Sequence, residues 1–169
     1  MSSPDPDQPH REERGAHVVA YSIDVDSSAE ELWEIAADPH RHHELDGSGT
    51  VRSSARGPER LNEGDTFSVR MRRFGFPYAL RLRVTESRPP RGAETGVVEW
   101  RQPTGHRWRW EFTPHDGDPQ SDPTRVTESY DASRQLPPVR AVLSRLKVEA
   151  ENSRSIRASL RRLHSRSAR

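Results

Sequence analysis

The hydrophobic period changes within one stretch near the start of the chain, where residues 19–37 read VAYSIDVDSSAEELWEIAA. Over residues 19–25 apolar and polar side chains alternate, which is typical of a strand with one buried face. Apolar residues then recur at helical spacing up to Ala37, before Asp38-Pro39 ends the helix. The stretch therefore predicts a strand and a short helix, joined by one of two capping boxes: Ser27 with Glu30, or Ser28 with Glu31.

Working outward, the strand period returns after Gly47 and continues to Tyr130. Segments rich in Gly, Pro and Asp separate the alternating groups, as hairpin connections require. This spacing predicts an antiparallel meander of about six strands. The apolar groups that define it are Phe67, Val69 and Met71; Tyr78, Leu80, Leu82 and Val84; Val98 and Trp100; Trp108, Trp110 and Phe112; Val126 and Tyr130.

Beyond Pro137-Pro138 the helical period returns and persists to Leu163 without a glycine or proline. This pattern predicts one long helix whose outer face is rich in arginine. An antiparallel sheet covered on one face by helices is an α+β fold. We expect the helix to pack on the sheet face that carries Trp108 and Trp110, with these residues buried: Val142, Leu143, Leu146, Ile156 and Leu160.

Length and composition limit the class of protein. A chain of 169 residues is typical of one domain, and the absence of cysteine excludes disulfides and thiolate chemistry. No apolar run reaches the ~20 residues of a membrane span, and residues 1–15 lack the apolar centre of a signal peptide. We therefore expect a cytoplasmic protein without a transmembrane segment, with a disordered arm over residues 1–15, one domain over 16–164 and a disordered tail over 165–169.

The order of these motifs is similar to that of START-like (SRPBCC) proteins. Residues 21–33 resemble their opening strand and Trp-bearing helix, and residues 38–51 resemble the next segment of the polyketide cyclase/dehydrase branch. Leu45 departs from that pattern, where an aromatic residue is common. The resemblance covers residues 16–164 and implies a helix-grip fold. In that fold, a curved sheet of about seven strands wraps a long C-terminal helix and leaves a cavity for a hydrophobic ligand.

Aromatic side chains on neighbouring strands are candidates for the wall of such a cavity. Ordinary core packing explains the same pattern, because the cavity wall and the core share one face of the sheet. The residues expected to contact a ligand are Phe67, Met71, Leu82, Trp100, Trp108, Trp110, Tyr130, Leu146, Asn152 and Ser153.

Polar residues at apolar positions are candidates for acid–base chemistry. Glu128 alternates with Val126 and Tyr130, and Glu149 falls on the apolar stripe of the last helix. If both carboxyl groups face one cavity, burial and mutual repulsion raise the pKa of at least one of them. Glu128, Glu149 and Tyr130 are therefore the catalytic candidates. The alternative is that a bulge turns Glu128 outward and that Glu149 pairs with Arg145.

Two further clusters favour no special chemistry. His40, His42, His43 and Glu44 have metal-ligating side chains, but their spacing is poor and no second cluster supplies further ligands. We expect a solvated polar loop there, with no metal and no cofactor. The nine basic residues between Val139 and Arg169 spread over a helix face without a nucleic-acid motif, which predicts no specific nucleic-acid binding.

Three functions remain after these exclusions. The first is binding or transport of a hydrophobic small molecule, such as a lipid or a polyketide, between the sheet and the last helix. The second is an aromatase/cyclase-type enzyme that uses a buried carboxylate. The third is an interaction module that uses the basic C-terminal helix. Each is compatible with a monomer or a homodimer.

Overall fold

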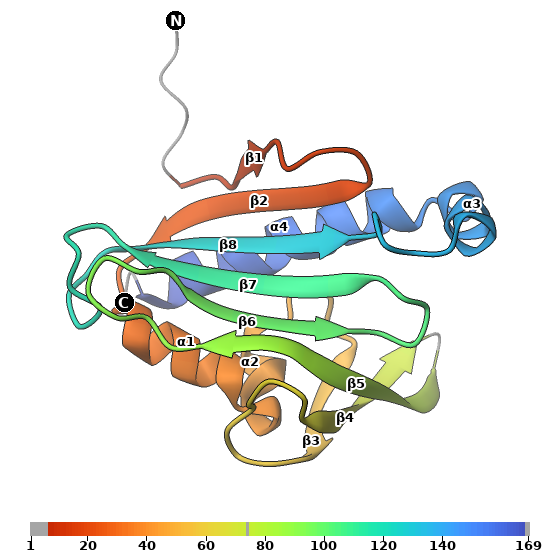
Figure 1. Ribbon diagram of the computed structural model, residues 1–169, viewed down its shortest axis with the longest axis horizontal. Helices are drawn as coiled ribbons and strands as arrows, with labels where there is room; N and C mark the ends of the chain where they lie inside the picture. The colour runs from red at the N-terminus through yellow and green to blue at the C-terminus, as the bar shows by residue number, and fades with distance from the viewer. Residues whose placement is uncertain (1–6, 74, 168–169) are drawn as a thin grey trace, which may run out of the picture.

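Eight antiparallel strands form one sheet in the computed structural model, which describes residues 7–73 and 75–167 (Figure 1). Their order across the sheet is β1-β2-β8-β7-β6-β5-β4-β3, so the first long strand lies beside the last. The strands are β1 (His10–Glu12), β2 (Val18–Val25), β3 (Val51–Arg56), β4 (Thr66–Arg73), β5 (Phe76–Arg88), β6 (Gly96–Arg101), β7 (Arg107–Pro114) and β8 (Thr124–Asp131).

The helices pack on one face of this sheet, and the longest of them, α4, lies along β2 and β8 (Figure 1). This arrangement is the α+β helix-grip fold expected from the sequence, with eight strands in place of about seven. Within the described residues, no helix is apolar over enough length to cross a membrane. The helices are α1 (Ala29–Ala37), the 3-10 turn η1 (Pro39–Arg41), α2 (His42–Leu45), α3 (Pro137–Arg145) and α4 (Val148–Ser167).

The predicted junction between β2 and α1 is confirmed in detail. Of the two capping pairs, the structure uses the second: Ser28 Oγ accepts a hydrogen bond from the backbone N–H of Glu31 at 3.2 Å. The helix ends at Ala37, as expected from the proline that follows. Its Trp33 is buried, and the indole N–H donates to the Val97 carbonyl at 3.0 Å. The helix is therefore fixed against β6 by an apolar contact and a satisfied polar group.

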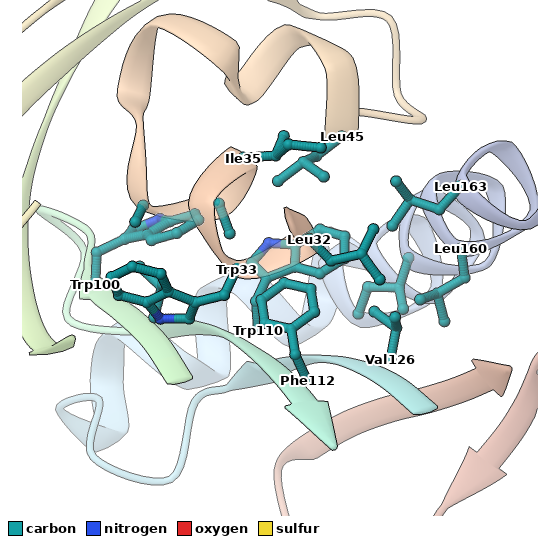
Figure 2. Packing of buried hydrophobic residues seen from close by; sticks show 14 of the residues in the cluster. Leu32, Trp33, Ile35, Leu45, Trp100, Trp110, Phe112, Val126, Leu160 and Leu163 are labelled. Carbon is teal, nitrogen blue, oxygen red and sulfur yellow. The ribbon is translucent and has the colours of Figure 1, made fainter. Parts of the chain in front are cut away.

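The core fills the space between α1, α4 and the inner face of the sheet (Figure 2). Phe112 and Val126 project from β7 and β8, while Leu160 projects from α4, and all three are fully buried. Alternation along each strand places these residues on the inner face. Apolar burial on this side is the main stabilising contribution to the fold.

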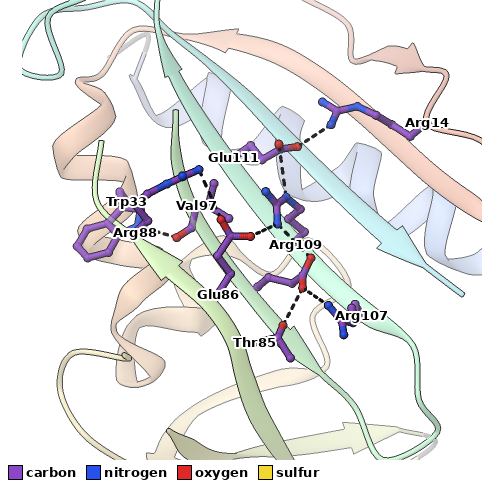
Figure 3. A network of polar contacts seen from close by, with 10 residues as sticks. Arg14, Trp33, Thr85, Glu86, Arg88, Val97, Arg107, Arg109 and Glu111 are labelled. Carbon is purple, nitrogen blue, oxygen red and sulfur yellow. Dashed lines mark hydrogen bonds and ion pairs between the residues drawn. The ribbon is translucent and has the colours of Figure 1, made fainter. Parts of the chain in front are cut away.

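The outer face of the sheet carries charges instead (Figure 3). Arg109 contacts Glu86 at 2.6 Å and Glu99 at 3.1 Å, and Arg107 contacts Glu99 at 2.8 Å. The hydroxyl of Thr85 donates to the same Glu99 carboxylate at 2.7 Å. Alternation directs Glu99, Arg107 and Arg109 away from the apolar layer, and a register shift between Val84 and Glu86 of β5 brings Glu86 to the same outer face.

The prediction of one long C-terminal helix is wrong at one position. Helix α3 ends at Arg145 and α4 begins at Val148, with Lys147 between them in the left-handed region at φ 56°. A non-glycine residue adopts this backbone conformation only occasionally, and it ends the helical hydrogen-bond pattern. Ile156 and Leu160 of α4 are buried as predicted. Val142 and Leu146 are 57% and 67% exposed, and no residue of α3, Leu143 included, is buried.

The expected disordered ends also require correction where the structure describes them. Residues His10–Glu12 form β1, which pairs with β2 in the register His10 with Ser22, so this part of the arm is ordered. Ser22 Oγ donates a short hydrogen bond to the Glu12 carboxylate at 2.5 Å. Helix α4 continues to Ser167, inside the expected tail. Residues 1–6 and 168–169 lie outside the described part of the chain.

Candidate functional site: a cavity between the sheet and helix α4

A cavity of about 320 Å³ lies between the inner face of the sheet, the α2–β3 segment and the N-terminal half of α4. Its apolar lining residues are Leu45, Val51, Val69, Met71, Tyr78, Leu80, Leu82, Trp100, Trp108, Trp110 and Val148. Its polar lining residues are His42, Asp46, Ser48, Thr50, Gln102, His106, Glu128, Glu151, Asn152, Ser155 and Ser159.

Strand register gathers the three tryptophans of the wall. Trp100 of β6 is paired with Trp108 of β7, and Trp110 of β7 is paired with both Val98 of β6 and Glu128 of β8. Side chains of directly paired residues project to the same face, so the aromatic rings and the carboxyl group share the inner face. The result is a broad aromatic wall with one acidic group set into it.

Glu128 is the most unusual group in the cavity wall. Its side chain is buried, and its Oε1 accepts a hydrogen bond from the Trp108 indole N–H at 2.8 Å. Its Oε2 is buried without a hydrogen-bond partner among the described residues. Burial raises the pKa of Glu128 well above the usual value, and the negative charge of Asp46 adds to that shift; the Trp108 hydrogen bond and the nearby Ser159 hydroxyl oppose it. Burial in this wall therefore shifts the equilibrium of Glu128 towards the protonated carboxyl.

The bulge considered for this part of β8 does not form. Glu128 is paired with Tyr21 on one side and Trp110 on the other, in a register that runs without interruption along both neighbours. Strict alternation therefore holds, and Glu128 faces inward, into the cavity.

A close contact between the α2–β3 segment and α4 fixes the wall next to Glu128. The backbone N–H of Gly47 donates to Ser159 Oγ at 2.9 Å, and Ser159 in turn donates to the Ser155 carbonyl at 3.1 Å. A Cβ atom at position 47 would lie 2.1 Å from the Ser159 backbone nitrogen, so only glycine permits this approach. The contact brings Asp46 and Ser159 to the same side of the cavity.

His42 contributes a neutral imidazole to the lining. The ring stacks on Trp100 with the centroids 4.9 Å apart, and its Nε2–H donates to the Ala36 carbonyl at 2.8 Å. Burial lowers the pKa of His42 from 6.5 to about 4, because the charged imidazolium loses its hydration. Near neutral pH the proton therefore sits on Nε2, and Nδ1 remains a hydrogen-bond acceptor.

His106 is a second neutral imidazole, placed at the β6–β7 turn. Burial lowers its pKa from 6.5 to about 4. Its Nδ1 lies 2.7 Å from Thr104 Oγ1 and 3.4 Å from the Gln135 amide nitrogen, and its ring packs on Tyr130 at 4.8 Å between centroids. The Gln135 amide can only donate to Nδ1, which is the acceptor nitrogen of the neutral ring.

The structure brings together many of the residues expected from the sequence. Glu128 lines the cavity, together with these predicted contact residues: Met71, Leu82, Trp100, Trp108, Trp110 and Asn152. The others lie elsewhere. Phe67 is buried behind His42 and Trp100, Tyr130 is buried against His106, and Ser153 bonds to the Tyr21 hydroxyl at 2.9 Å. Leu146 points into solvent.

The expected pairing of Glu128 with Glu149 is replaced by a different one. Glu149 is half-buried and does not line the cavity; its charge acts on Tyr130, whose pKa is raised first by burial and then by Glu149 and Asp131. The carboxylate that acts on Glu128 comes from Asp46. Glu149 lies in the first turn of α4, where Val148 and Glu151 line the cavity but Glu149 does not.

Several residues that line the cavity were not predicted from the sequence, because no periodicity or motif marks them. His106 lies in a hairpin turn, and His42 lies in what was expected to be a solvated loop but is a buried helical turn. Of these residues, only Ser159 could have been predicted from the sequence. This small polar residue lies on the buried stripe of α4, three positions after Ile156 and one before Leu160. A short polar residue on an apolar stripe indicates a close approach or a space beside the helix.

The histidine cluster separates into different contacts. His40 Nε2 lies 3.2 Å from the Gly57 carbonyl, and His43 Nδ1 lies 3.1 Å from the His40 carbonyl. Glu44 pairs with Arg41 and with Arg166. Among residues 7–73 and 75–167, no three His, Asp or Glu side chains converge in a way that could hold a metal ion.

Comparison with known proteins gives a family match over nearly the whole chain. The family described as polyketide cyclase/dehydrase and lipid transport matches residues 16–168. The uncharacterized protein Rv0088 of Mycobacterium tuberculosis is 47% identical over 115 residues, which cover 67% of this chain and 46% of that protein. The matched region thus spans less than half the length of that relative.

Solved structures share the fold at low identity. The di-domain aromatase/cyclase BexL from the BE-7585A biosynthetic pathway superposes with a TM-score of 0.61 at 18% identity, covering 86% of this chain and 45% of BexL. A START superfamily protein from Mycobacterium smegmatis gives a TM-score of 0.53 at 18% identity, covering 89% and 99%. The chain shares its fold with these proteins, and by the family match it belongs to the polyketide cyclase/dehydrase and lipid transport family.

Proposed function

We propose that this protein binds a hydrophobic small molecule in the cavity between the sheet and α4. The observation that carries the proposal is the cavity itself, about 320 Å³ in volume and walled by Trp100, Trp108 and Trp110. Ligand pockets range from ~300 to ~1,000 Å³ and combine an apolar wall with a few polar groups. The family and the fold of its solved relatives support the same class of ligand.

The polar groups of the wall favour a ligand that carries a carbonyl oxygen. A protonated Glu128 donates a hydrogen bond through the oxygen that has no protein partner, and a ligand carbonyl inside the cavity accepts it. Satisfying a buried polar group removes a cost of roughly 1–3 kcal/mol. A flat polyketide-like molecule with ring carbonyls also stacks well on three tryptophans.

Two probes test the binding proposal: the neutral fluorophore N-phenyl-1-naphthylamine and the carbonyl-bearing anthraquinone. We expect each to bind at one site per chain, with enhanced probe emission for the first, quenched tryptophan emission for the second, and a higher melting temperature for both. The proposal is contradicted if neither probe gives a saturable signal.

A pair of neighbouring substitutions locates the binding site. Leu80→Trp fills the cavity, because Leu80 lines it, and this change should abolish probe binding. Ala79→Trp is the matched control, since Ala79 is exposed on the opposite face of the same strand. Equal probe affinity in the two variants, measured by naphthylamine emission at unchanged melting temperature, contradicts binding in this cavity.

A second candidate function is catalysis of the aromatase/cyclase type, and Glu128 is the specific observation that favours it. A buried carboxyl group with a raised pKa can give a proton to a substrate carbonyl oxygen and take one from carbon. Because Glu149 and Tyr130 do not line the cavity, this candidate rests on Glu128 alone.

Turnover of a linear poly-β-ketone thioester, followed by chromatography of the products, separates the two candidate functions. If the protein is an enzyme, Glu128→Gln abolishes cyclisation and keeps anthraquinone binding, while Glu149→Gln retains activity. If the protein is a carrier, the wild type forms no product beyond the uncatalysed background, and Glu128→Gln changes only the affinity for carbonyl ligands.

A further inference from the structure

Large hydrophobic side chains that are exposed gather on two elements of the described chain. Phe76 and Tyr78, at the start of β5, are 74% and 41% exposed. The other exposed large hydrophobic residues lie in α3 and beside its ends: Leu136, Val142 and Leu146. We call these five residues the apolar rim. Exposed apolar groups that cluster in this way mark interaction sites.

The start of β5 and helix α3 lie towards the same end of the sheet (Figure 1). Tyr78 of β5 and Val148, which follows α3, line the cavity together. The Gln135 amide donates to the Thr104 carbonyl at 3.1 Å, which places the start of α3 beside the turn that carries His106. Because Tyr78 is both exposed and part of the cavity wall, the cavity reaches the surface at the rim.

Helix α3 exposes Val142 to solvent, and Leu136 and Leu146 beside its two ends are exposed as well. It packs against α4, yet none of its own residues is buried. Lys147, in the left-handed conformation, turns α3 away from the direction of α4. An amphipathic helix held in this way has an apolar surface available for an external partner.

Charge identifies the kind of partner that fits this surface. Residues 66–84, which include β4 and the part of β5 before Glu86, contain five arginines and no acidic residue, and residues 136–148 contain two arginines, one lysine and no acidic residue. The whole chain has 27 basic and 26 acidic residues, so this excess is local. The first acidic residues after α3 are Glu149 and Glu151, which belong to α4.

We propose that the apolar rim docks on an anionic phospholipid surface, with Phe76 and Leu146 inserted among the lipid head groups and the cavity opening towards the bilayer. Exposed apolar side chains on two segments whose charged residues are all basic match such an interface, where acyl chains lie beneath anionic head groups. A second copy of this chain fits less well, because two rims face to face bring like charges together. Docking of this kind lets an apolar ligand enter the cavity without crossing water.

Vesicle flotation tests the proposal on the full chain. We expect binding to phosphatidylcholine vesicles with about 30% phosphatidylglycerol, much weaker binding to pure phosphatidylcholine, and release at high salt because exposed charges are screened. Phe76→Ser combined with Leu146→Ser should reduce the bound fraction about tenfold or more, since two inserted side chains are lost. Both residues are exposed, so the fold is retained, as an unchanged melting temperature will verify.

A matched pair of charge reversals tests the electrostatic part. Arg81→Glu should weaken vesicle binding about fivefold or more. Arg91→Glu should not, because Arg91 is exposed beyond the opposite end of β5. If both variants lose vesicle binding to the same extent, the proposal is overturned. The vesicles are then attracted by the charge of the whole protein and not by the basic residues beside the apolar rim. Binding by the wild type to an acidic protein but not to anionic vesicles overturns it as well.

Probe binding in solution separates this proposal from the proposed ligand-binding function. In the absence of vesicles, the Phe76→Ser, Leu146→Ser variant should bind N-phenyl-1-naphthylamine with wild-type affinity, because neither residue lines the cavity. Vesicle binding that persists at the wild-type level in this variant overturns membrane docking while leaving ligand binding intact.

Discussion

The two ends of the sheet's inner face differ in how the helices cover them. At one end, Trp33 of α1 and Leu160 of α4 meet Phe112 and Val126, and the space is filled (Figure 2). At the other end, α4 presents short or polar side chains to the sheet, namely Asn152, Ser155 and Ser159, and a cavity remains.

This difference shows that the helix decides where the space lies. The strands supply large residues at both ends, including Trp108 and Leu82 beside the cavity and Phe112 within the core. The change from large to small side chains along α4, together with the turn at Lys147 that leads α3 away, leaves the second end unfilled. A filled end holds the fold, and a hollow end is free to accommodate a ligand.

The largest expected effect compares truncation at the two ends. Leu160→Ala should reduce the free energy of unfolding by about 2–5 kcal/mol, because it opens a void in a packed core. Leu80→Ala should cost roughly 1 kcal/mol, since Leu80 is half-buried and already borders an empty space. Urea unfolding of both variants gives the two values. Equal losses contradict the division into a filled and a hollow end.

The next effect is an acid sensitivity that arises in the cavity lining. The folded state keeps His42 neutral with a pKa of about 4, whereas the unfolded chain protonates near pH 6.5. Stability from this group is therefore complete above pH 6.5 and is lost as the pH falls towards 4. For one fully buried imidazole the loss reaches about 3 kcal/mol.

His42→Gln should flatten this part of the stability profile, measured by urea unfolding between pH 7 and pH 4. Glutamine can retain a donor for the Ala36 carbonyl. His106→Gln should also reduce the loss of stability between pH 7 and pH 4, because burial lowers the pKa of His106 to about 4 as well. Profiles that are as steep in both variants as in the wild type contradict the neutral, buried state of these rings.

Glu128 should produce a pH dependence of the opposite sign. Burial raises its folded-state pKa above that of the unfolded chain, so the folded protein holds this proton more tightly. Its contribution is complete below about pH 4.5. As the pH rises from there towards the raised pKa, stability is lost at up to about 1.4 kcal/mol per pH unit.

Glu128→Gln removes the titrating group and should leave a variant that loses less stability than the wild type between pH 5 and pH 8. Saturating anthraquinone should have the opposite effect on the wild type: a hydrogen bond to the ligand stabilises the protonated carboxyl and raises its pKa further, so the loss of stability with rising pH continues to higher pH. A wild-type profile that matches the Gln variant contradicts the raised pKa.

The smallest expected effect concerns the exposed helix at the hollow end. Leu146→Ala should change the free energy of unfolding by less than about 0.5 kcal/mol, since the side chain is 67% exposed. Thermal unfolding of this variant beside Leu160→Ala provides the contrast. A loss of 2 kcal/mol or more would mean that α3 continues α4 in solution and that Leu146 packs on the sheet.

Most of the fold was predictable because short-range patterns report it directly. The alternation of residues 19–25, the Ser28 cap and the proline after Asp38 fixed the first strand and helix, and these are confirmed. The parity that aims Glu128 inward also held, because no bulge interrupts β8. The short strand β1 was not predicted, because residues 10–12 form a strand only by pairing with β2 at the edge of the sheet.

The site was predictable only in part. Strand parity placed Trp100, Trp108 and Trp110 on the right face, but it could not separate Phe67, which is buried behind the wall, from Met71, which forms it. Periodicity on the last segment was misleading as well. Val142 and Leu146 continue the apolar stripe in the sequence, yet the backbone turn at Lys147 removes them from the core.

The sequence by itself determined the α+β class and the order of strands and helices, because each depends on local periodicity and capping; uninterrupted pairing of β8 decided between the two directions open to Glu128. Tertiary structure alone decided that Asp46 faces Glu128, that Gly47 touches Ser159, and that α3 turns outward to leave an apolar rim beside the cavity. These features depend on contacts between segments 82 and 112 residues apart, or on one left-handed residue among good helix formers, and no pattern of neighbouring residues encodes them.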